Sequence, residues 1–528
     1  MRKYKFLTII TAASLPVSLC SCSLENFGYD SESSEVENTL ETPDYSYDTV
    51  DIADVNEDIR KLLEDIKTSD NEKAVQDDID VLLKYADTAS DAMTYKCIES
   101  YLDWDNYDLE CEYEEISETF YVIGDALGYA FAKGSKSQYS ELFKELIDDE
   151  AAEYYTQRGM NLSRVEGYAS VDYNVNDENV DSYFDIAYDD SLSDNEKNLK
   201  CAEIYLEVLS NIDPESYYEY YNRDYTPEDI LKLSDKVDEK IKPAVSELYD
   251  RFEENKYSDD VFDSPVVFDD PFEKMKEYTS RLSSDIDKSA DRLINEELYT
   301  IAEGDNCYTG SFTTDLPTDN TALIYIYTDG SYYDMSSAIH EFGHFHASFS
   351  DDTNAYLTET NLDVAEIQSQ GMELMFMQFY DEIYGKQSEA MKLKLLCDLA
   401  DAVVSGFQVG EFEYRALEKA EELTPEEVLE LYDEVMGDDA EGYPFYYMTH
   451  IFEAPGYYIS YGVSALAALD MLDEVRSDPA AALEKYEKIA AVPSNSKDCG
   501  FRDSLKECGF SDVLTEEYID ELAEELLK

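Results

Sequence analysis

Apolar side chains recur at three- and four-residue spacing through most of the chain after residue 50. This spacing places them on one face of a helix, so the pattern predicts a mainly α-helical protein. The clearest examples are residues 51–66, 74–89, 114–132 and 137–155, and further helices fit residues 227–248 and 270–302. The sequence has no fixed-period repeat, no phosphate-binding glycine loop and no alternation of strands with helices. We therefore expect a multi-helix fold with an N-terminal helical region over residues 51–213.

One run departs from the helical pattern. Residues 321–331, TALIYIYTDGS, are rich in β-branched and aromatic side chains and end in Asp329-Gly330. They predict a strand of a small antiparallel sheet, directly before the next helix. An exposed strand edge there can pair with an extended peptide backbone, although an ordinary edge strand would give the same pattern.

The next helix covers residues 334–349, DMSSAIHEFGHFHASF. Its apolar stripe consists of Met335, Ala338, Ile339, Phe342, Phe345 and Phe349. His340 and His344 fall on the opposite side, one turn apart, so both imidazoles can bind one metal ion, with Glu341 beside them. His346 falls on the apolar stripe, where a packed, hydrogen-bonded histidine is expected rather than a ligand.

A third ligand is needed, and the segment 361–384 offers two candidates. It is apolar nearly all the way round from Val364 onward, so a carboxylate inside it is costly unless it is paired or coordinated. Glu366 and Glu373 are seven residues apart and share one face. One of them can be the third ligand, and the other can orient a histidine.

These residues resemble the thimet oligopeptidase and oligoendopeptidase F family of zinc metallopeptidases. HEFGH at 340–344 and DVAEIQSQGMEL at 363–374 are similar to the zinc motif and the glutamate-bearing second helix of that family. The resemblance continues at 406–418 and 450–469 and weakly at 504–512, so it covers roughly the second half of the chain. It implies that His340, His344 and Glu366 bind zinc, that Glu341 is the base and that Glu373 supports a ligand.

The segment 450–461 adds a candidate for charge stabilisation. It holds the fourth histidine of the chain, His450, followed by Tyr457 and Tyr461. Peptide hydrolysis develops negative charge on the carbonyl oxygen, and fixed donors near the metal stabilise that charge. The resemblance implies that Tyr457 and His450 are these donors and that Tyr461 binds substrate, although tyrosine is abundant here and any of the three rings could belong to the core.

The sequence departs from the family in two respects. Ala347 stands where the family usually has a further histidine, and the chain is shorter than typical members. The first departure removes a contact near the metal. The second predicts that part of the helical shell around the active site is missing.

The first residues predict export and lipid attachment. Three basic residues precede an apolar run from Phe6 to Leu19, which is too short to span a bilayer and is typical of a signal peptide over residues 1–21. Leu19-Cys20-Ser21-Cys22 resembles a bacterial lipobox, which makes Cys22 the lipidated residue; a plain secreted protein is the alternative. Residues 22–50 are acidic and poor in aliphatic side chains, so we expect a flexible tether. The chain is then a bacterial membrane lipoprotein outside the cytoplasm.

Charge and cysteine content limit the partners. The formal net charge is −82, which disfavours binding to nucleic acid and attracts cationic peptides and metal ions. The lipid is expected to be the sole membrane attachment, and we expect a monomer. Seven cysteines remain after Cys22; Cys97 with Cys111, or Cys499 with Cys508, lie near enough in sequence to bridge.

Taken together, these features predict that residues 214–528 form the catalytic region of a zinc endopeptidase. It would hydrolyse short peptides, with Glu341 activating a water on the zinc. The alternatives are a catalytically inactive peptide- or metal-binding lipoprotein on a peptidase fold and a purely structural helical lipoprotein. The intact Glu341 argues against the first, and the gathered histidines argue against the second.

Overall fold

The computed structural model describes residues 45–528 except 105, 158–174, 190, 213, 215–216, 219–220, 258–260, 305 and 438. The predicted signal peptide, the lipidation site Cys22 and the tether up to residue 44 lie outside the described residues. In the described part, no helix is both long enough and apolar enough to cross a membrane. The described cysteines form no disulfide, so neither candidate bridge is present.

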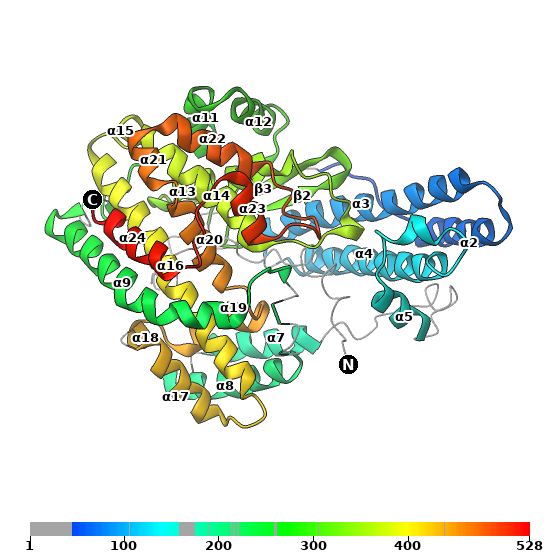
Figure 1. Ribbon diagram of the computed structural model, residues 1–528, viewed down its shortest axis with the longest axis horizontal. Coiled ribbons are helices and arrows are strands. Elements are labelled where there is room, and N and C mark those ends of the chain that lie inside the picture. Colours follow the sequence, from blue (N-terminus) through cyan, green and yellow to red (C-terminus); the bar gives the residue numbers. More distant parts are fainter. Residues whose placement is uncertain are drawn as a thin grey trace.

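The N-terminal helices form an elongated bundle at one end of the molecule (Figure 1). They are α2 (Ile52–Thr68), α3 (Glu72–Leu102), α4 (Tyr107–Gly134), η2 (Ser140–Phe143) and α5 (Asp149–Gln157). Their apolar faces enclose a separate core, which also takes in Tyr356 from a distant loop. Residues 137–155, expected as one helix, form two short helices.

A three-stranded sheet lies between this bundle and the remaining helices (Figure 1). Its strands are β1 (Tyr299–Ala302), β2 (Phe312–Leu316) and β3 (Thr321–Tyr327), in the order β1-β3-β2. The expected antiparallel pairing holds for β2 with β3, where Thr313 lies opposite Ile324. The sheet is mixed, however, because β1 pairs parallel to β3.

The helices before the sheet pack against several different parts of the larger core. They are α7 (Val175–Ala187), α8 (Asp194–Ser210), α9 (Pro227–Glu254), α11 (Pro271–Leu282) and α12 (Ser284–Asn295). The continuous helix expected over 270–302 is wrong. The Ser283 side chain accepts from the Ile286 amide and so begins a new helix, and Glu297 has a φ of 55° that turns the chain into β1.

The C-terminal half is almost entirely helical. It consists of α13 (Tyr333–Ser348), η5 (Ala355–Leu357), α14 (Leu362–Phe376), η6 (Met377–Phe379), α15 (Tyr380–Ile383), η7 (Gly385–Gln387), α16 (Ser388–Glu418), α17 (Pro425–Met436), α18 (Asp439–Gly442), η8 (Phe445–Tyr447), α19 (His450–Glu453), α20 (Ile459–Leu469), α21 (Leu472–Ser477), α22 (Pro479–Ala490), α23 (Phe501–Cys508) and α24 (Glu516–Leu526). Helices α13 and α14 pack together at the centre, and α16 packs against α9 and α20. The expectation of a mainly α fold with a small sheet beside the central helix is confirmed.

Candidate metal centre and active site

A tight turn aims α13 away from the end of β3. Gly330 adopts a φ of 78°, which a residue without a Cβ tolerates. The Asp334 side chain accepts hydrogen bonds from the amides of Asp329 and Gly330, at 3.3 and 3.1 Å. The apolar stripe of α13 is buried, as its spacing predicts. This anchoring and the buried stripe fix the direction in which α13 presents its two motif histidines.

Three predicted ligands meet where α13 packs on α14. One ligand atom from each of His340, His344 and Glu366 lies within 4.8 Å of the others, and this is the one such group of three metal-binding side chains among the described residues. His340 and Glu366 are 2% and 0% exposed. The Nε2 atoms of both histidines are buried and have no hydrogen-bond partner within the described part of the chain. Two unused imidazole nitrogens beside a carboxylate are a donor set that fits zinc.

Neighbouring side chains hold two of these ligands in place. The Glu373 carboxylate accepts from His340 Nδ1 at 2.8 Å, which orients the ring so that Nε2 faces the metal position. Tyr457 donates to Glu366 Oε1 at 3.1 Å, and Ser369 donates to Glu366 Oε2 at 3.4 Å. Both carboxylates singled out in the sequence thus lie at the centre, with Glu366 in the group of three candidate ligands and Glu373 behind His340.

The charges of the site are strongly coupled. Burial alone lowers the pKa of His340, but Glu366 and Glu373 outweigh it and raise that pKa well above the ordinary value. Burial lowers the pKa of His344 to about 4, so its imidazole is neutral at pH 7. Burial would raise the pKa of Glu366, but the two histidines lower it. The centre therefore presents an ionised carboxylate and at least one neutral imidazole.

Gly343 allows the two ligand-bearing helices to approach this closely. A Cβ at this position would lie 2.6 Å from Ser369 Cα and 2.7 Å from the Gln368 carbonyl oxygen, both backbone atoms of α14. Any larger residue would push α14, and with it Glu366, away from the histidines. The glycine inside the HEFGH motif thus sets the distance between the ligands.

Strand β2 reaches the candidate base. The Thr313 hydroxyl lies 2.7 Å from Glu341 Oε2 and 3.0 Å from the Glu341 carbonyl oxygen and donates to both. Glu341 is fully buried. Sequence reasoning missed Thr313, because β2 is a short strand with mixed polarity and no pattern of its own.

The segment 450–461 packs against the metal centre. Tyr457 reaches Glu366, as above, and its ring lies 5.1 Å from that of Tyr461 and 6.1 Å from the imidazole of His450. The Tyr461 hydroxyl lies 3.4 Å from His450 Nε2. The structure therefore brings these three residues to one wall of the site, beside Glu366.

The turn 454–458 that carries Tyr457 is fixed by groups that sequence reasoning missed. Gly456 has a φ of 86°, and its amide donates to Glu413 of α16 at 2.7 Å. Tyr221 donates to the Pro455 carbonyl oxygen at 2.8 Å. Burial raises the pKa of Glu413 to about 7. The available signal for Glu413 was its place as one of two carboxylates, with Glu411, in the mostly apolar run GFQVGEFEY.

His346 serves packing, as its place on the apolar stripe predicts. Its Nδ1 lies 2.9 Å from the Ser289 hydroxyl of α12. Its ring stacks on Tyr486 of α22, with the centroids 6.3 Å apart. It therefore links α13 to its neighbours and does not join the ligand group.

Two histidines from an HExxH helix and a glutamate from the following helix form a donor set of the kind that a zinc metallopeptidase uses. Residues 286–492, which include all three residues of this group, match the sequence model of peptidase family M3. The protein is a zinc metallopeptidase.

Solved structures share the fold. The structure of PZ peptidase A with inhibitor 2 has a TM-score of 0.71 and 16% identity, over 92% of this chain and 98% of that chain. A structure assigned to oligoendopeptidase F has a TM-score of 0.70 and 16% identity, over 92% and 97%. One assigned to oligoendopeptidase F from Bacillus anthracis str. Ames has a TM-score of 0.66 and 15% identity, over 91% and 96%. No curated protein sequence matches this chain.

These coverages bear on the expected loss of part of the helical shell. The chain spans 96% or more of each of the three structures, so relative to them no large part of the fold is missing. The expectation of a reduced shell is therefore wrong for these neighbours.

Proposed function

We propose that this zinc peptidase is an oligoendopeptidase that cleaves short peptides outside the cytoplasmic membrane. The observation that carries the proposal is the position of Glu341, which lies beside the three-ligand group and also contacts edge strand β2 through Thr313. A peptide that pairs with the free edge of β2 would bring its backbone to the carboxylate. Binding and catalysis would then share one strand.

The chain's own groups support a general-base mechanism. Zinc held by His340, His344 and Glu366 would supply Lewis acidity, which acidifies water and polarises the scissile carbonyl. The Glu341 carboxylate takes a proton from the attacking water and delivers it to the nitrogen of the leaving amine. Thr313 holds one carboxylate oxygen of Glu341 and so fixes the direction in which the other points.

The opposite wall stabilises the developing negative charge. Tyr457 and His450 donate to the oxyanion, and Tyr461, which contacts His450, binds the substrate backbone. Tyr457 donates to Glu366 in the resting site, so it exchanges this bond for one to the reacting oxygen. A donor that is used fully only in the transition state raises the turnover rate.

The location rests on the N-terminal sequence. The basic residues, the short apolar run and the lipobox-like Leu19-Cys20-Ser21-Cys22 favour export and lipid attachment at Cys22. Cys22→Ala is expected to move the protein from the detergent phase to the aqueous phase in a phase-separation experiment. An unchanged partition would exclude attachment at this residue.

The activity is tested with internally quenched fluorescent peptides of graded length. The parent protein and Glu341→Gln are compared, with zinc content measured in both. We expect about one zinc per chain in each, cleavage that favours short peptides in the parent, and a loss of roughly 100- to 10,000-fold in kcat for the variant, the range of general-base catalysis.

Each result has a distinct meaning. If both proteins bind zinc and neither cleaves any peptide, the peptidase proposal fails and a peptide- or metal-binding lipoprotein takes its place. Zinc in neither would refute the ligand group. Equal cleavage of long, folded proteins would contradict the preference for short peptides.

A further inference from the structure

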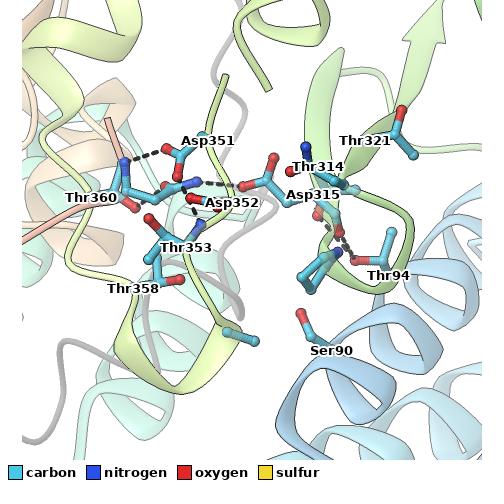
Figure 2. Close-up of a pocket in the computed structure, with 14 residues that line it drawn as sticks. Ser90, Thr94, Thr314, Asp315, Thr321, Asp351, Asp352, Thr353, Thr358 and Thr360 are labelled. Atoms are coloured by element: carbon cyan, nitrogen blue, oxygen red, sulfur yellow. Dashed lines mark hydrogen bonds between the residues drawn. The ribbon is translucent and has the colours of Figure 1, made fainter. Parts of the chain in front are cut away.

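An acidic cavity, apart from the metal centre, lies at the C-terminal end of β2 (Figure 2). It is a cavity between β2, the loop that follows α13, and α3. Its lining includes the carboxylates of Asp315, Asp351 and Asp352 together with several threonine hydroxyls, and none of its lining residues is basic. The cavity therefore gathers negative charge and hydrogen-bond acceptors without an internal cation.

The cavity lies along the path that a bound peptide would follow. Asp315 is two residues beyond Thr313 on β2, so both side chains lie on the same face of the strand, roughly 7 Å apart along it. Thr313 contacts Glu341. In the described part of the chain β2 pairs with one strand, β3; at its other edge no strand pairs, and Thr94 of α3 donates to the Asp315 carbonyl oxygen at 3.2 Å. A peptide paired beside Thr313 would pass the base, and its next side chains would reach the cavity where α3 meets the strand.

The polar groups of the cavity are held in place but not neutralised. Asn495 joins the two sides, because its side-chain Nδ2 donates to Asp315 and its backbone N–H donates to Asp351, both at 2.8 Å. Thr321 also lines the cavity; it is 3% exposed, and its hydroxyl has no hydrogen-bond partner among the described residues.

The arrangement differs from a metal site. The carboxylates of Asp315, Asp351 and Asp352 do not converge as the zinc ligands do, because no second group of three metal-binding side chains meets within the described chain. Calcium needs six to eight converging oxygens. A lysine ammonium or an arginine guanidinium carries three to five N–H donors, which suit acceptors spread around a cavity.

We infer that this cavity binds a lysine or arginine side chain of the peptide substrate, within about two residues of the scissile bond. The inference rests on the proposed peptidase function and adds the class of substrate. Asp315 and Asp352 supply the exposed negative charge. Asp351 also caps the amides of Thr353 and Asn495, so it shapes the cavity.

The test uses pairs of fluorogenic peptides that differ in one residue, lysine or norleucine, placed in turn at the two positions on each side of the cleaved bond. We expect the parent to favour lysine at one position by about tenfold in kcat/KM, the scale of a partly exposed charged hydrogen bond. Asp315→Asn/Asp352→Asn is expected to bring this ratio close to one. The site of cleavage is followed by mass spectrometry.

A matched control separates local charge from net charge. Glu426→Gln/Glu430→Gln removes the same two charges from the exposed face of α17, away from the sheet (Figure 1), and should keep the lysine preference. A parent without preference at any position, a double Asp variant that keeps it, or a control that loses it equally would each overturn the inference.

The same peptide pairs keep the inference separate from the proposed function. Their binding to zinc-loaded Glu341→Gln is measured by fluorescence anisotropy, with and without the two Asp substitutions. If the parent cleaves no peptide, the peptidase proposal fails, and the binding ratio still decides whether the cavity selects lysine. A lysine-to-norleucine binding ratio near one, both with and without the two Asp substitutions, would refute the inference about the cavity.

Discussion

The metal centre and the turn that carries Tyr457 hold their functional groups in different ways. The ligands sit on α13 and α14, two helices that touch backbone to backbone at Gly343. Tyr457 sits on a short turn whose position depends on two single hydrogen bonds: the Gly456 amide donates to Glu413, and Tyr221 donates to the Pro455 carbonyl oxygen. The first arrangement is built from packing, and the second is built from polar contacts.

This difference separates two properties of the enzyme. Displacing packed helices requires the core to rearrange, so metal binding should be lost together with stability. The turn can change without moving either helix, so the rate of catalysis should be adjustable while zinc stays bound. The turn is linked to the packed helices by the hydrogen bond that Tyr457 donates to Glu366, at 3.1 Å.

Among the variants that test this comparison, the largest effect is expected from removing the Tyr457 hydroxyl. Tyr457→Phe is expected to lower kcat by about 100-fold, the loss typical for one oxyanion donor, with the zinc content unchanged. Steady-state kinetics and metal analysis of the same preparation check this. Tyr443→Phe, which removes a hydroxyl bonded to the Tyr447 carbonyl oxygen, is the matched control and should keep activity. Loss of zinc from Tyr457→Phe would contradict the expectation that the catalytic rate can change while zinc stays bound.

The next prediction concerns the packed side of the comparison. Gly343→Ala places a Cβ against the α14 backbone and should lower the free energy of unfolding by about 1–3 kcal/mol, with weaker zinc binding. Gly124→Ala, in the middle of α4 with open space around its Cβ position, should raise it by roughly 0.5–1 kcal/mol. Denaturant unfolding of the zinc-loaded proteins measures both. If both substitutions change the free energy of unfolding in the same direction, close packing at Gly343 does not explain the result.

The metal centre was largely predictable from the sequence, whereas its surroundings were not. His340 and His344 follow from helical periodicity, and Glu366 and Glu373 stand out as carboxylates in an apolar helix, both of which are local patterns. The choice of Glu366 as the ligand came from the family resemblance. The bond between Glu413 and Gly456 joins residues 43 positions apart in the sequence, and no local pattern encodes it. Thr313 was missed for the same reason.

The smallest expected effect is a change in the pH dependence of stability. It tests the polar contacts that hold the turn 454–458. Burial raises the pKa of Glu413 from 4.5 to about 7 in the folded protein, so between these values the folded chain keeps a proton that the unfolded chain has lost. This group's contribution to stability is therefore largest at low pH and falls as the pH rises through that window. Glu413→Gln removes this contribution while keeping a side-chain oxygen for the Gly456 amide.

From pH 5 to pH 6 the parent should lose about 1 kcal/mol more of unfolding free energy than Glu413→Gln does. Denaturant unfolding of both zinc-loaded proteins at the two pH values measures this difference. Identical pH dependence would mean that the carboxyl ionises normally and that the turn is held by a charged group. In that case Glu413→Gln should instead lower kcat, because the weaker acceptor would release Gly456 and with it the position of Tyr457.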